Sequence, residues 1–72
     1  MIRVIAENLG YREIERLGAF LKACSNKAKY YDNINRWLEL GFEYVEIGYD
    51  LHYDEPYMTN ECDMKLYESD FE

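Results

Sequence analysis

A run of alternating residues between positions 42 and 55 constrains the fold more than any other part of the chain. Apolar and aromatic side chains alternate there with mainly polar ones. Because successive side chains of a strand point to opposite faces, the run predicts one long strand with a buried face and a water-facing one. The buried face would hold Val45, Ile47, Tyr49, Leu51 and Tyr53, and the other Tyr44, Glu46, Gly48, Asp50, His52 and Asp54.

Two helices are expected between this strand and a shorter one at residues 1–7. Residues 11–24 and 27–40 place apolar side chains at three- and four-residue steps, which is typical of helices with one buried stripe. Gly41 is expected to end the second helix in a left-handed conformation. The stripes are Ile14, Leu17, Leu21 and Cys24 in the first helix, and Tyr30, Tyr31, Ile34, Trp37 and Leu38 in the second.

Proline is expected to end the long strand at Pro56, because it has no N–H for a strand ladder. Residues 57–61 would then form a loop, and residues 62–67 a third strand that forms a hairpin with the second. A short terminal helix is the alternative for 62–68, and residues 69–72 are expected to fray. The sequence therefore predicts one α+β domain over 1–72 in the order β-α-α-β-(β). Its two helices would pack on one face of a two- or three-stranded antiparallel sheet.

The charge of the chain is unevenly distributed, with a formal net value of −7. Residues 1–36 contain seven basic and four acidic residues, a net charge of +3. Residues 37–72 contain one basic residue, Lys65, against eleven acidic ones, a net charge of −10. Such a division indicates that the C-terminal half presents a charged surface.

No pattern typical of catalysis or of cofactor binding is found. The single histidine, His52, has acidic neighbours but no recognisable nucleophile motif to act with, and there is no glycine-rich phosphate loop. Asp50, His52 and Asp54 could share an ion at alternate strand positions, but a calcium-type loop and a second ligand cluster are both missing. We therefore expect a protein that is not an enzyme and that has no metal and no cofactor.

Cellular location is inferred from the cysteines and from hydropathy. Cys24 and Cys62 match no zinc or redox spacing, so we expect reduced thiols. No apolar run approaches the ~20 residues of a membrane span, and the start of the chain does not read as a signal peptide. We expect a cytoplasmic protein with no membrane contact, located in the host cytoplasm if it is encoded by a phage.

The acidic surface itself is the candidate site. Alternate strand residues lie ~6.8 Å apart, and a DNA strand carries one phosphate per ~3.4 Å of axis, so a row of carboxylates can imitate a nucleic acid. Interleaved tyrosines would add flat contact area at low entropic cost. We expect this surface to bind a basic nucleic-acid-binding protein (a nuclease, repair enzyme or repressor), and not to bind nucleic acid itself. A homodimer is also possible, because so short a chain buries little surface alone. The predicted partner-binding residues are Glu43, Tyr44, Glu46, Asp50, His52, Tyr53, Asp54, Glu55, Tyr57, Glu61 and Asp63.

In size, acidity and tyrosine content the chain resembles the small inhibitors that phages and mobile elements make against nucleic-acid enzymes. These include anti-restriction proteins, anti-CRISPR proteins and inhibitors of uracil-DNA glycosylase. The resemblance lies in composition, carries over no site residue, and implies an inhibitor that acts by DNA mimicry.

Two alternatives stay open. The order strand, helix, turn, helix, strand, strand is also that of a winged-helix core, and Lys27 and Lys29 at the start of helix 27–40 suit phosphate contact. The protein would then be a DNA-binding regulator. The other alternative is a general protein-interaction domain whose acidic face only keeps it in solution.

Overall fold

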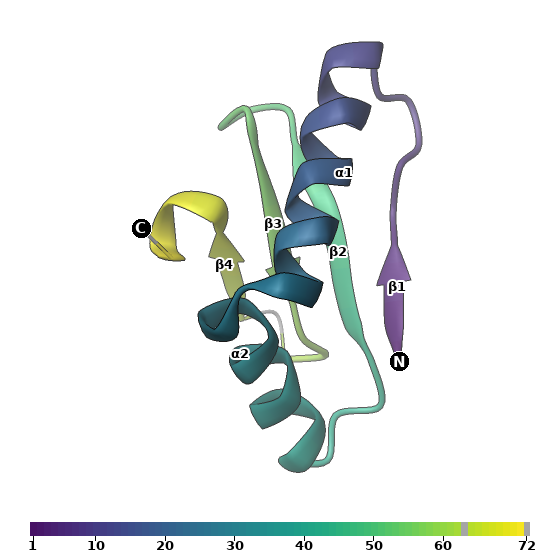
Figure 1. Ribbon diagram of the computed structural model, residues 1–72. Helices are drawn as coiled ribbons and strands as arrows, with labels where there is room; N and C mark the ends of the chain where they lie inside the picture. Colours follow the sequence, from purple (N-terminus) through teal and green to yellow (C-terminus); the bar gives the residue numbers. More distant parts are fainter. Residues whose placement is uncertain (63, 72) are drawn as a thin grey trace.

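Two helices pack against one face of a four-stranded sheet in the computed structural model, which describes residues 1–62 and 64–71 (Figure 1). The predicted α+β class, with both helices on one face, is confirmed. The elements are β1 (Ile2–Val4), α1 (Tyr11–Asn26), α2 (Ala28–Glu39), β2 (Val45–Asp50), β3 (Glu55–Thr59), β4 (Lys65–Tyr67) and the 3-10 helix η1 (Glu68–Phe71). None of the helices described is both long and apolar enough to cross a membrane.

The sheet is mixed, whereas an antiparallel sheet of two or three strands was predicted. Its strands lie in the order β1-β2-β3-β4, and β1 runs parallel to β2 while the other neighbours are antiparallel. The reason is visible in Figure 1: both helices run back along the sheet, so that the chain enters β2 from the same end as β1. A crossover of this kind joins parallel strands.

The core lies between the helices and the sheet. Leu17, Phe20 and Cys24 of α1 and Tyr30, Ile34 and Trp37 of α2 pack against Val45, Ile47 and Met58 of the sheet. The burial predicted for the two helices is therefore correct for most residues of each apolar stripe and wrong for some of them. Ile14 is 49% exposed and Tyr31 39% exposed, whereas Phe20, outside the predicted stripe, is fully buried. Gly41 has φ +102°, as its predicted role requires.

The strand predicted over 42–55 is wrong before Val45 and beyond Asp50, since β2 covers only Val45–Asp50. β2 ends at Asp50, residues 51–54 turn, and the chain returns as β3. Asp54 has φ +56°, a left-handed conformation that aspartate tolerates better than most residues. Leu51 and Tyr53, predicted on the buried face, are each 61% exposed because they belong to this turn.

The prediction for the segment after Pro56 is also corrected. Residues 57–59, predicted as part of a loop, belong to β3. Pro56 is tolerated because it lies just beyond the part of β3 that pairs with β4, so that β4 does not need the N–H it lacks.

The third predicted strand forms only at residues 65–67, as β4, and it pairs with β3 and not with β2. Residues 68–71, expected to fray in part, form η1. Its Phe71 ring stacks on Tyr30, with ring centroids 4.4 Å apart.

Candidate protein-binding face

The face of the sheet opposite the helices is the candidate site, and we call it the open face. On β2, Val45, Ile47 and Tyr49 point to the helices, so the alternate residues point away from them. The pairing of the strands extends this face across the sheet. By this alternation the open face consists of Arg3, Glu46, Gly48, Asp50, Glu55, Tyr57, Thr59, Lys65 and Tyr67. Tyr44, which directly precedes β2, lies beside it, because its ring contacts the Arg3 guanidinium.

Tyrosine rings form a cluster on the open face and at its end. Tyr57 and Tyr67 lie edge to face across β3 and β4, with centroids 6.2 Å apart, and Tyr53 of the turn packs edge-on against Tyr67 at 5.3 Å. Gly48 makes room for this cluster, because a Cβ at that position would lie 2.7 Å from the Tyr57 hydroxyl. The Nζ of Lys65 lies 4.5 Å from the centre of the Tyr57 ring. The cluster is therefore a packed group of inclined aromatic rings held in place by contacts with one another.

Asp50 connects the aromatic cluster to the β2–β3 turn. Its Oδ2 accepts a hydrogen bond of 2.7 Å from the Tyr67 hydroxyl, and its Oδ1 accepts the backbone N–H groups of His52 and Tyr53. The bond from Tyr67, followed by these backbone bonds, lowers the pKa of Asp50, and the same bond raises the pKa of Tyr67 to about 12. Asp50 therefore keeps its charge near neutral pH while fixing the turn.

All four residues of the β2–β3 turn are exposed, and Leu51, His52 and Tyr53 precede Asp54 in it. The His52 and Tyr53 rings meet edge to face with centroids 4.8 Å apart. Both residues were predicted to belong to the site. The structure places them at the end of the open face beside Tyr67, in a turn and not in a strand.

Asp54 does not join the row of carboxylates to which it was assigned. Its carboxylate accepts two hydrogen bonds of 2.9 Å from Arg12 on α1 and one of 2.6 Å from the buried Tyr49 hydroxyl. Arg16 adds an ion pair and also binds the Asp54 carbonyl oxygen. Arg12 and Tyr49 hold the pKa of Asp54 well below its usual range. Because the turn reverses the chain, Asp54 faces α1 and acts as a structural clamp.

Three further acidic residues of the predicted site, Glu43, Glu55 and Glu61, make hydrogen bonds that join neighbouring segments of the chain. Glu55 binds the backbone N–H and the hydroxyl of Ser69. Glu61 accepts the backbone N–H groups of Glu43 and Tyr44, at 2.5 and 3.2 Å, and so fixes the segment before β2. Glu43 itself is exposed, and Asp63 lies outside the described residues.

Of the predicted site residues, the structure brings Glu46, Asp50, Glu55 and Tyr57 onto the open face, with Tyr44 beside it and His52 and Tyr53 at its end. The prediction missed the cations Arg3 and Lys65. Arg3 pairs in register with Glu46 and lies over the Tyr44 ring, 4.6 Å from its centre. The signal for Lys65 was its alternation with Met64 and Leu66, whereas nothing in the sequence placed β1 beside β2.

The two layers of the molecule differ in charge. Residues 11–40, which contain both helices, carry six basic against four acidic side chains. The rest of the described residues carry two basic side chains, Arg3 and Lys65, against nine acidic ones. The charge division along the sequence therefore becomes a division between the helical layer and the remainder of the fold.

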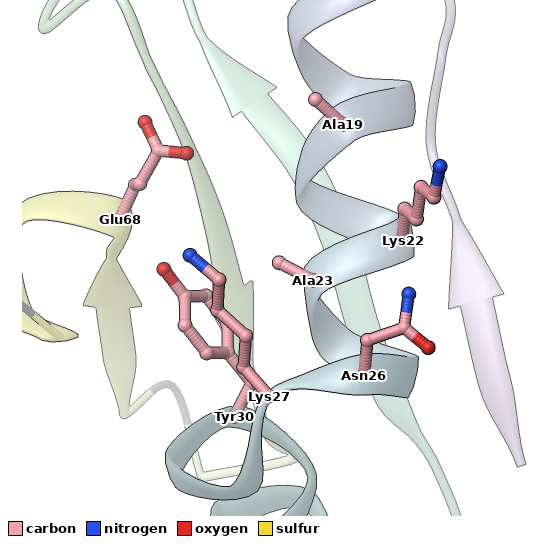
Figure 2. A pocket seen from close by; sticks show the side chains of 7 residues that line it. All are labelled: Ala19, Lys22, Ala23, Asn26, Lys27, Tyr30 and Glu68. Atoms are coloured by element: carbon pink, nitrogen blue, oxygen red, sulfur yellow. The ribbon is translucent and has the colours of Figure 1, made fainter.

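A cavity of about 360 Å³ lies on the helical side of the molecule and includes no residue of the open face. Figure 2 shows Lys22 and Asn26 of α1, Lys27 and Tyr30 near the start of α2, and Glu68 of η1 around it. Within residues 1–62 and 64–71, no three His, Cys, Asp or Glu side chains are grouped to hold a metal ion. The alternate spacing of Asp50, His52 and Asp54 does not bring them together, because the strand ends at the first of them.

No family model, no curated protein and no solved structure matches this chain.

Proposed function

We propose that the protein is a non-enzymatic inhibitor that uses its open face to occupy the basic nucleic-acid-binding surface of a partner protein. Such a DNA mimic would serve a phage or mobile element against a host nuclease, repair enzyme or repressor. The observation that carries the proposal is the combination of carboxylates and ordered tyrosine rings on a sheet face that no helix covers.

The spacing of the carboxylates supports this function. Glu46 and Asp50 are four residues apart on β2, which corresponds to about 14 Å at ~3.4 Å per residue. A DNA strand also rises ~3.4 Å per phosphate, so these two carboxylates match phosphates about four steps apart. Glu55 lies directly opposite Asp50 on β3 and extends the negative charge across the sheet.

Order within the face supports a binding role as well. Tyr57 and Tyr67 are held by neighbouring rings, and Tyr67 also by its bond to Asp50. Rigid tyrosines supply contact area without a large loss of side-chain freedom on binding. Opposite charges would accelerate association with a basic partner, and this acceleration would decrease as salt screens the charges.

Capture from a bacterial lysate tests the proposal when immobilised wild-type protein is compared with paired variants. Glu46→Lys reverses a charge on the open face, and Glu39→Lys reverses an exposed charge on α2 as its control. Tyr53→Ala removes an aromatic ring beside the open face, and Tyr11→Ala, which is 84% exposed on α1, is its control.

We expect the wild type and both controls to retain a nucleic-acid-binding protein at low salt and to release it at high salt or on addition of duplex DNA. Glu46→Lys and Tyr53→Ala should retain much less of it. Equal retention by all four variants, or capture of proteins that DNA does not displace, would contradict the proposal.

A further inference from the structure

We propose that the outer edge of β1 is a dimer interface, at which β1 pairs antiparallel with β1 of a second copy of the chain. This inference does not rest on the proposed function. It rests on the unpaired backbone of β1, on the exposure of its side chains and on the distribution of charge around it.

The backbone of β1 is paired on one side only. β1 is the end strand of the described sheet and its single strand neighbour there is β2. The bonds Val45 N to Met1 O and Ile5 N to Ile47 O show that the odd-numbered residues face β2. Because successive residues of a strand direct their N–H and C=O groups to opposite sides, Ile2 and Val4 direct theirs to the free edge.

The side chains of β1 are exposed although their neighbours on β2 are in the core. Ile2 and Val4 are 46% and 48% exposed, while their register partners Val45 and Ile47 are 0% exposed. Figure 1 shows the cause: β1 lies at the margin of the sheet, beyond the helices.

Met1 and Ile5 are also exposed, at 72% and 39%. Ile14, 49% exposed, extends the apolar area onto α1. It lies on the flank away from Arg12 and Arg16, because two residues turn a helix by about 200°. Edge strands are usually protected by proline, a bulge or several charges, and β1 has Arg3 alone.

A second copy fits this edge because the edge is self-complementary. With a two-fold axis at Arg3, Ile2 of each copy lies opposite Val4 of the other, and each such pair exchanges both of its hydrogen bonds. All the outward-facing polar groups of β1 are then satisfied. The apolar side chains of the two copies also cover one another on the helical side of the sheet.

Charge favours the same arrangement. Residues 1–6 contain no acidic residue, so pairing of β1 with a second β1 brings no carboxylates of the two strands together. The two Arg3 side chains would come together on the open face, but each has Glu46 as its register partner on β2. Because the two-fold axis is perpendicular to the sheet, the open faces of both copies would lie on one side and form a single longer surface.

Sedimentation velocity over a dilution series from millimolar to low micromolar protein tests this interface. Val4→Pro removes an N–H that faces the free edge and leaves the bonds to β2 in place. Val4→Thr, which keeps the N–H and the branched shape, is the matched control. We expect the wild type and Val4→Thr to sediment as dimers at high concentration and to dissociate on dilution, and Val4→Pro to stay monomeric throughout.

A second measurement covers the case in which Val4→Pro does not fold. Amide hydrogen exchange of the wild type should slow at Ile2 and Val4 as concentration rises, and should not change at the exposed Leu51. A wild type that is monomeric at every concentration, a folded Val4→Pro that dimerises like the wild type, or exchange at Ile2 and Val4 that is independent of concentration would each overturn the inference.

Discussion

Truncation of Ile47 is the perturbation whose effect follows most directly from the fold. Ile47 lies in the middle of β2, is fully buried, and pairs with Met58, which is also fully buried. With β1 and β3 on either side and the helices above, the surroundings have little freedom to fill a cavity. Ile47→Ala should therefore cost about 2–5 kcal/mol of unfolding free energy. For a domain of this length the total is about 4–11 kcal/mol, so the variant will be partly unfolded at moderate temperature.

Leu51→Ala is the matched control, because the sequence alternation assigned both residues to one buried face. Leu51 is 61% exposed in the β2–β3 turn, and its truncation should change stability by no more than about 0.5 kcal/mol. Urea unfolding followed by the fluorescence of the buried Trp37 measures both values. Equal destabilisation by the two substitutions would show that the chain continues as a strand through residue 51, and would refute the hairpin.

Three further predictions concern single residues. The hydrogen bond from Arg12 is the chief reason that the pKa of Asp54 is lowered in the folded protein. The ionised carboxylate therefore stabilises the fold at pH values above its unfolded pKa of about 3.9. This stabilisation is lost as the pH falls toward the folded pKa. The thermal midpoint of Asp54→Asn should accordingly lie below that of the wild type at neutral pH, and the gap should close in acid; a gap independent of pH would contradict the clamp. Gly41→Ala should lower the free energy of unfolding in urea by about 1–2 kcal/mol, because alanine is strained at a φ of +102°. An added Cβ meets no atom within 4 Å, so this cost would come from the backbone conformation alone. An unchanged midpoint would argue against the left-handed helix end. Cys62 should react with a thiol reagent in the native protein, whereas Cys24, buried and with its pKa raised to about 11, should react only after unfolding; equal rates would disprove that burial.

The helices and the core could be predicted because periodicity reports burial directly. Leu17, Cys24, Ile34 and Trp37 recur at helical spacing and all lie in the core. The hairpin could not be predicted in the same way, because the alternation of residues 45–49 continues by chance through the exposed turn. The clamp of Asp54 to α1 joins it to Arg12, 42 residues away in the chain, and local alternation does not report such a contact.

The part of the candidate site that lies on β2 could be predicted, and the part that depends on pairing with other strands could not. Alternation along β2 correctly placed Glu46 and Asp50 on the helix-free face, since that step uses local geometry alone. The cations Arg3 and Lys65 reach this face through strand pairings with distant segments, which composition does not reveal. The open face is therefore less uniformly acidic than the sequence indicated, and more aromatic.

The central claim, that the open face imitates a nucleic acid, is tested most directly by the fluorescence anisotropy of a labelled DNA duplex. The partner captured from the lysate should bind the duplex and raise its anisotropy. Adding the wild-type protein should displace the duplex and return the anisotropy to the value of free DNA. The Glu46→Lys variant should reach the same displacement only at a much higher concentration than the Glu39→Lys control. The protein alone should leave the anisotropy unchanged at near-physiological salt. A rise caused by the protein alone, weakened by Lys27→Ala with Lys29→Ala, would contradict the claim and identify α2 as a DNA-binding helix.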